Sequence, residues 1–266
     1  MQNESTPQAP APVVVKLGGA ILADAEATAA VWAGVAAMAE PVVVVHGGGP
    51  QATALARRLG HEPTIVAGRR VTGDLDLEVA LYTLRGALNA RLVGAARAAG
   101  LRAVGVSGAD GALVTVAKRP PIEIDGQRVD FGHVGDVQSV DPALVQTLLG
   151  AGFVPVVSTV CADVAGALYN VNADTVAADL AAALGAPRLD LVTEAGGVRR
   201  DADDPSSHLP RLTEAEVVTG VAEGWIAGGM RPKLETALAA LRRGVPSVRV
   251  CAPADLGGDG GTVVTA

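Results

Sequence analysis

Two runs of β-branched residues that end in glycines constrain the fold of this chain most. Residues 13–19 read VVVKLGG, and residues 42–50 read VVVVHGGGP. β-Branched residues favour strands, and a strand that is apolar at consecutive positions is typical of burial on both faces. Glycines directly after a strand let the backbone turn sharply and let a ligand approach the main chain. The sequence therefore predicts buried parallel strands with a binding loop at the end of each.

Strands and helices alternate along the rest of the chain. The predicted helices lie near residues 24–39, 51–59, 76–99, 141–149, 173–184, 213–223 and 231–243. Further strands are predicted at residues 101–108, 153–159, 167–171, 189–193, 247–251 and 262–266. Residues 112–131 alternate apolar and polar side chains around Asp125-Gly126, which predicts a hairpin. The alternation predicts an α/β fold, a mostly parallel sheet with helices on both faces and ligands beyond the carboxyl ends of its strands.

The bulk composition excludes some classes of partner. A net charge of −7 and a pI of about 5.1 argue against a nucleic-acid backbone or an anionic membrane as partner. Glycines and Pro155 interrupt the most apolar stretch, residues 143–169, so no membrane span is predicted. Residues 1–12 are proline-bearing and are expected to form a disordered tail rather than a signal peptide, which predicts a cytoplasmic protein. Cys161 and Cys251 are far apart and are expected to be buried free thiols.

Two lysines beside glycine loops are candidate site residues. Lys16 ends an apolar strand, where an ammonium group is costly unless it meets an anion or an acid. Lys233, in GGMRPK, falls at the start of a helix, where a cation opposes the helix dipole. Each lysine alone is also compatible with a solvated surface position. The two strands that end in glycine, one with Lys16 and one with His46, indicate paired backbone cradles for an anionic group. Tight strand-to-helix turns are the alternative explanation of these glycines.

Two polar segments add further candidates. In NVNAD, residues 170–174, the side chains of Asn170, Asn172 and Asp174 would share one face of an extended segment. Asp174 considered alone is more typical of a helix cap. GRRVT places Arg69 and Arg70 in a segment poor in charge, and arginine is suited to bidentate binding of a carboxylate. One of these two arginines is expected to be solvated.

Taken in order, the motifs KLGG, HGGGP, GRRVT, GHVG, NVNAD and GGMRPK resemble those of the amino-acid kinase family. The resemblance runs from about residue 13 to the end of the chain. More narrowly, the chain resembles those members that use ATP to phosphorylate the side-chain carboxylate of N-acetyl-L-glutamate in arginine biosynthesis. It implies an αβα sandwich around a mostly parallel sheet of about eight strands. It also implies acyl-acceptor binding and dimerisation in residues 13–172, and binding of ATP, with Mg²⁺ on its phosphates, in residues 173–266.

The resemblance implies roles for individual residues in phosphoryl transfer. Lys16 and Lys233 bind the phosphoryl oxygens from opposite sides, and Asp174 holds both lysines in place. No residue is expected to bind a metal ion directly. The expected nucleotide-binding residues are Gly18, Gly19, Thr193, Glu194, Gly197, Gly229 and Met230. Glu194 stands where the nucleotide loop of the family usually has aspartate.

The resemblance also implies the residues that bind the acceptor. Gly48 and Gly49 offer backbone N–H groups to the acceptor carboxylate and the incoming phosphoryl group. Arg70, assisted by Asn170, pairs with the α-carboxylate of the acceptor. His46 is expected to be structural.

Two other functions on the same fold compete with this one. The first is a kinase acting on acetylated or carrier-linked 2-aminoadipate in lysine biosynthesis, and the carboxylate clamp of Arg70 argues against a carrier-linked substrate. The second is a non-catalytic sensor of amino acid or nucleotide, and retention of both lysines argues against it. The predicted tail is too short for the N-terminal helix of hexameric family members, so a homodimer is expected.

Overall fold

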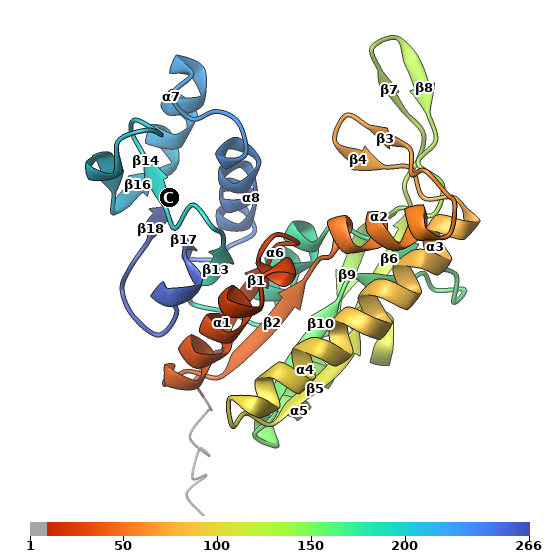
Figure 1. The fold of residues 1–266 in the computed structure, drawn as a ribbon, viewed down its shortest axis with the longest axis horizontal. Coiled ribbons are helices and arrows are strands. Elements are labelled where there is room, and N and C mark those ends of the chain that lie inside the picture. The colour runs from red at the N-terminus through yellow and green to blue at the C-terminus, as the bar shows by residue number, and fades with distance from the viewer. Residues whose placement is uncertain (1–9) are drawn as a thin grey trace, which may run out of the picture.

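The structure, a computed structural model, describes residues 10–266, so most of the predicted tail lies outside the described residues. An eight-stranded sheet with the order β16-β18-β17-β13-β1-β2-β10-β5 forms the centre (Figure 1). Every neighbouring pair is parallel except β17 and β18. The strands are β1 (Val13–Leu17), β2 (Val42–His46), β5 (Ala103–Ser107), β10 (Val154–Ser158), β13 (Leu189–Val192), β16 (Arg211–Thr213), β17 (Ser247–Cys251) and β18 (Thr262–Thr265). The predicted, mostly parallel sheet of about eight strands is confirmed.

Helices cover both faces of this sheet, because alternate valines of β1 and β2 point to opposite sides. Val14 and Val45 pack in the core beneath α6 (Ala173–Ala183), α5 (Ala143–Gly150), α7 (Glu214–Glu223) and α8 (Met230–Arg242). Val15 and Val44 pack on the other side, with Trp32 of α1 (Ala25–Ala37) and with α4 (Asn89–Ala98). The expected αβα arrangement follows from this alternation. Short 3-10 turns lie at Ile21–Ala23, Asp110–Ala112, Pro205–Ser207 and Pro253–Asp255.

The limits of the predicted helices agree with the structure to within two residues, and two of the helices differ at positions that bear on the site. α2 (Gly49–Arg58) begins at the last glycine of HGGG, earlier than the predicted residue 51. The helix predicted for residues 76–99 starts at Asp74, as α3 (Asp74–Ala80), continues as a π-helical segment (Leu81–Leu88) and ends as α4. Leu84 and Leu88 of the π-helical segment occupy the space that a Cβ atom on Gly48 would need. Helix and glycine loop are therefore in direct contact.

A second sheet and two hairpins extend the N-terminal part of the chain. The second sheet has the order β12-β11-β6-β9, from β6 (Val114–Lys118), β9 (Gly135–Val140), β11 (Val160–Ala162) and β12 (Leu168–Asn170). The hairpins are β3 (Ile65–Val66) with β4 (Arg69–Arg70), and β7 (Ile122–Ile124) with β8 (Gln127–Val129). Asp125 and Gly126 have φ of 50° and 74°, which confirms the predicted β7–β8 turn. A third small hairpin joins β14 (Val198–Arg199) to β15 (His208–Leu209).

The β3–β4 and β7–β8 hairpins project from the body on the same side (Figure 1). Their bases are joined at Thr72, which donates its N–H to the Phe131 carbonyl (2.9 Å) and accepts from the His133 N–H (2.7 Å). Gly132 of the GHVG motif pairs with Thr72 in this bridge. The motif thus ties one hairpin to the other.

Both cysteines are buried free thiols, as predicted. Burial raises the pKa of Cys161 and of Cys251 to about 12, which keeps both thiols protonated and unreactive. Across residues 10–266, none of the helices combines the length and the apolar character needed to span a membrane.

Candidate active site

Lys16 and Asp174 form an ion pair of 2.8 Å at the carboxyl end of β1. Lys16 lies on the α6 face of the sheet, and Asp174 lies in the first turn of α6. Asn172 caps this helix, because its side-chain oxygen accepts from the N–H groups of Asp174 (2.7 Å) and Thr175 (3.2 Å). The expectation that Asn170, Asn172 and Asp174 share one extended face is therefore wrong, since the chain turns into α6 after Asn172. The cap leaves the Asp174 carboxylate available to Lys16.

Lys233 lies near this pair without sharing its carboxylate. Its ammonium donates to the Gly229 carbonyl at 2.9 Å. Burial lowers the pKa of Lys233, and the positive charge of Lys16 lowers it further. The carboxylates of Asp174 and Glu194 act on that pKa in the opposite direction. Within residues 10–266 the ion pair of Asp174 is with Lys16, and Lys233 has none. Two neighbouring ammonium groups with only one paired carboxylate leave a local excess of positive charge, which favours the binding of an anion.

The two glycine loops next to Lys16 carry unpaired backbone donors. The N–H groups of Gly18, Gly19, Gly48 and Gly49 have no hydrogen-bond acceptor among the described residues. The loops lie against each other, since the Gln51 side chain donates to the Gly19 carbonyl at 2.8 Å. Gly49 also begins α2, whose first N–H groups carry partial positive charge. The loops thus place free backbone donors beside Lys16, which is the arrangement that the predicted anion cradle requires.

A cavity of about 180 Å³ near this cradle is lined by arginines. Its lining residues are Arg69, Arg70, Arg119, Val134, Asn170, Val171, Asn172 and Thr175. The structure therefore brings together the predicted pair Arg70 and Asn170. Arg69 is exposed, which confirms that one of the two arginines is solvated. We call this space the arginine cavity.

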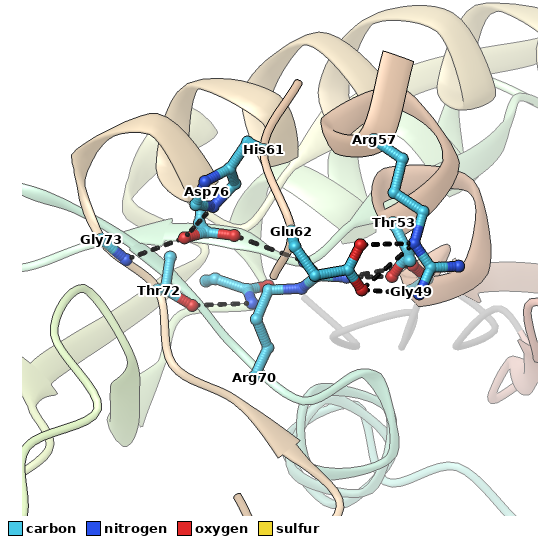
Figure 2. A network of polar contacts seen from close by, with 10 residues as sticks. Gly49, Thr53, Arg57, His61, Glu62, Arg70, Thr72, Gly73 and Asp76 are labelled. Carbon is cyan, nitrogen blue, oxygen red and sulfur yellow. Dashed lines mark hydrogen bonds and ion pairs between the residues drawn. The ribbon is translucent and has the colours of Figure 1, made fainter. Parts of the chain in front are cut away.

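Arg70 is oriented by protein groups around it (Figure 2). Its guanidinium donates to the Thr53 hydroxyl and to the Gly49 carbonyl (3.3 Å), and it lies 3.4 Å from the Asp76 carboxylate. Asp76 is 6% exposed, and His61 contacts its other oxygen at 3.0 Å. The Arg70 side chain is 11% exposed. Its guanidinium is therefore fixed in place at the wall of the cavity.

Arg119 is a lining residue that sequence analysis missed. It follows β6, and its guanidinium donates twice to one carboxylate oxygen of Asp136, at 2.9 and 2.6 Å. Nothing in the local sequence KRPP separates this arginine from a surface charge. Its place in the cavity depends on the pairing of β6 with β9, which the irregular sequence of β9, GDVQSV, does not reveal in advance.

A larger cavity, of about 570 Å³, lies in the C-terminal part of the chain. Its lining residues are Thr193, Glu194, Ala195, Gly197, Val198, Arg199, Ala202, Trp225, Ile226, Ala227, Gly228, Gly229, Met230 and Lys233. Five of the seven predicted nucleotide-binding residues are among them, and the other two, Gly18 and Gly19, lie instead beside Lys16. Trp225 was not predicted; the Arg200 guanidinium covers its ring at 4.4 Å from the centroid. We call this space the nucleotide cavity, after the ligand that the sequence predicts for these residues.

Comparison with known proteins gives a consistent result. A sequence model of the amino acid kinase family matches residues 11–252. Acetylglutamate kinase from Symbiobacterium thermophilum is 45% identical over 242 residues, which cover 90% of this chain and 83% of the relative. Acetylglutamate kinase from Methanopyrus kandleri is 42% identical over 231 residues, which cover 87% of this chain and 91% of the relative. A carbamate kinase from Giardia shares the fold, with a TM-score of 0.70 at 15% identity over 97% of this chain and 99% of that one. The chain belongs to the amino acid kinase family.

Proposed function

We propose that this protein transfers the γ-phosphoryl group of ATP to the side-chain carboxylate of N-acetyl-L-glutamate, as a step of arginine biosynthesis. Two relatives at 45% and 42% identity carry the name acetylglutamate kinase, which supports this substrate. The structural observation that carries the proposal is the Lys16–Asp174 ion pair, with Lys233 next to it. Lys233 lines the nucleotide cavity. Asn172 and Thr175, which flank Asp174, line the arginine cavity.

The chemistry needs charge stabilisation more than proton transfer. An oxygen of the acceptor carboxylate attacks the γ-phosphorus, and a new P–O bond forms as the bond to the bridging β–γ oxygen breaks. The electron pair of that bond leaves with ADP, and the product is N-acetylglutamyl 5-phosphate. A carboxylate is already a nucleophile, so no general base is required. Because two anions approach each other, the two ammonium groups and the unpaired glycine N–H groups carry the catalysis.

The nucleotide cavity is suited to ATP. Its volume, about 570 Å³, lies in the range of small-molecule sites. Trp225 and Met230 supply apolar surface, and Lys233 supplies positive charge at the end nearest Lys16. Mg²⁺ arriving on the ATP phosphates would neutralise part of their charge. Lys233 would bind the γ-phosphoryl oxygens from the nucleotide side and Lys16 from the acceptor side.

The arginine cavity is suited to the α-carboxylate of the acceptor. Arg70 has further N–H groups beyond those already bonded to protein, and its orientation is set before a ligand arrives. Asn170 supplies an amide for a second polar contact. Residues 13–172 would therefore bind the acceptor, and residues 173–266 would bind ATP.

Two finer assignments complete the proposal. β5 is the terminal strand of the large sheet, so one of its edges has no strand partner in residues 10–266. Such an edge favours pairing with a second copy, which supports a homodimer. Light scattering tests this, and a hexamer would contradict it.

The use of ATP and an amino-acid derivative favours the cytoplasm as the location.

The decisive experiment is a coupled ADP-release assay with six acceptors compared side by side. These are N-acetylglutamate, N-acetyl-2-aminoadipate, glutamate, aspartate, carbamate and UMP. N-Acetylglutamate should give the highest kcat/KM, and absence of ADP release with it refutes the proposal. One extra methylene changes binding by only about 1–3 kcal/mol, so N-acetyl-2-aminoadipate is the stringent comparison.

The three lysines of the chain allow a matched control. Lys16→Met should lower kcat about 10²–10³-fold, because one donor to the transferring phosphoryl group is lost. Lys118→Met makes the same chemical change at a half-exposed lysine that pairs with Asp130 at 3.1 Å. Lys118→Met should keep the wild-type kcat. Equal loss in both variants would show that the effect of Lys16→Met is not specific to the site.

A further inference from the structure

His46 is a buried histidine that the proposed chemistry leaves without a role. It ends β2 and is fully buried. In the sheet it pairs with Leu17, so both side chains lie on the face covered by α1 and α4. Lys16 and α6 are on the opposite face. His46 therefore cannot contact the phosphoryl group, although it directly precedes the glycines of the cradle.

The hydrogen bonds of His46 fix which ring nitrogen carries the proton. The Asn89 amide nitrogen lies 3.1 Å from Nε2 of His46, and the same nitrogen donates to the Val156 carbonyl at 2.9 Å. A carbonyl only accepts, so this Asn89 atom is the donor and Nε2 of His46 is an acceptor. Nδ1 therefore carries the hydrogen and donates to the Gly47 carbonyl at 2.8 Å.

This bond sets the orientation of the next peptide group. The Gly47–Gly48 peptide is trans, so its C=O and N–H point in opposite directions. With the Gly47 carbonyl drawn toward His46 on the α4 face, the Gly48 N–H points toward the face of Lys16 and Asp174. That N–H has no acceptor among residues 10–266. Glycine on both sides of the peptide leaves its orientation sterically free, so the histidine bond decides it.

We propose that His46 is a positioning residue for phosphoryl transfer, which holds the Gly48 N–H toward the oxyanion bound beside Lys16. Without the bond, a rotated peptide would present the Gly47 carbonyl oxygen to that anion and repel it. The bound oxygens are those of the acceptor carboxylate and of the phosphoryl group that combine into an acyl phosphate. The inference rests on the proposed function, which the six-acceptor assay tests separately.

Two substitutions separate this role from packing. His46→Leu removes the donor and keeps the site apolar. His46→Asn keeps a side-chain N–H group that can donate to the Gly47 carbonyl. We expect His46→Leu to lower kcat with N-acetylglutamate about 10²-fold while the KM for ATP stays near wild type. His46→Asn should recover at least about a tenth of the wild-type kcat. Wild-type kcat in folded His46→Leu, or equal loss in both variants, overturns the role.

A measurement on the wild-type protein keeps the inference testable even if the variants do not fold. Nitrogen NMR of ¹⁵N-labelled imidazole should show a protonated Nδ1 and an unprotonated Nε2 for His46 near neutral pH. The Gly48 amide proton should move downfield when N-acetylglutamate and a non-hydrolysable ATP analogue are added together. The opposite tautomer, or an unmoved Gly48 amide in a protein that binds both ligands, overturns the inference. A wild-type protein that releases no ADP with N-acetylglutamate refutes the proposed function instead.

Discussion

Acid should destabilise this protein through His46. Burial lowers the pKa of His46 from 6.5 to about 4, only partly opposed by the hydrogen bond to Gly47. In the unfolded chain the imidazole takes up a proton near pH 6.5, whereas in the folded protein it stays neutral until about pH 4. The unfolded state therefore binds more protons between these values, and stability falls as the pH falls. The stabilisation is fully present above pH 6.5 and is lost by about pH 4.

The size of this effect follows from the two pKa values. Their difference, 6.5 minus about 4, is about 2.5 pH units, which corresponds to about 3 kcal/mol at about 1.4 kcal/mol per unit. Relative to pH 7, the loss should be about 1 kcal/mol at pH 5.5 and about 2.5 kcal/mol at pH 4.5. This is a substantial part of the stability of an ordinary domain, about 5–15 kcal/mol.

Urea denaturation of the wild type and of His46→Asn at these three pH values measures the effect. Carboxylates titrate in both proteins, so the difference between the two unfolding free energies isolates His46. As the pH falls, the unfolding free energy of the wild type should decrease more than that of His46→Asn. A difference that stays constant to within about 0.5 kcal/mol from pH 7 to 4.5 would refute the reasoning, because it would mean that His46 titrates alike in both states.

Three further substitutions test other parts of the structure. Lys233→Met should lower kcat about 10²–10³-fold in the ADP-release assay, and an unchanged kcat would contradict its role at the phosphoryl group. Asp76→Asn should loosen Arg70 and raise the KM for N-acetylglutamate about tenfold, with a smaller change in kcat; saturation curves that keep the wild-type KM would count against the clamp. Asp190→Asn should lower the unfolding free energy by about 3–5 kcal/mol, because it removes the negative charge that pairs with the buried Arg249 guanidinium at 2.8 Å. Urea denaturation measures this, and a loss below about 1 kcal/mol would contradict it.

The fold class could be predicted because buried parallel strands leave a strong sequence pattern. β1 and β2 bury consecutive valines on both faces, and few other structures tolerate such runs beside glycines. The short strands β9, β14 and β16 could not be predicted. β9 reads GDVQSV and shows no regular alternation, and the two others span two or three residues. Such strands form because a partner is present, not because of local preference.

Site residues that belong to a sequence motif could be predicted. Site residues that are defined by a contact with a distant part of the chain could not. Lys16, Asp174 and Lys233 were identified from ordered motifs, and the structure brings them together. Asp76 was not identified, because an acid in the first turn of a helix is ordinary for electrostatic reasons alone. Asn89 contacts His46 across 43 positions of sequence, and only the folded helix–sheet contact creates that pair.

In the proposed mechanism, the ends of β1 and β2 allow groups on both faces of the sheet to act on one reaction. Lys16 pairs with Val45 and Leu17 pairs with His46, so successive positions send an ammonium group to the α6 face and an imidazole to the α4 face. The glycine loops that follow cross the edge between these faces. A peptide there can be bonded through its carbonyl on one side while its N–H serves a ligand on the other. Substitutions in the core between α4 and the sheet should therefore change kcat, although these residues line neither the arginine cavity nor the nucleotide cavity. The kcat of a site built on one face alone would not respond to them.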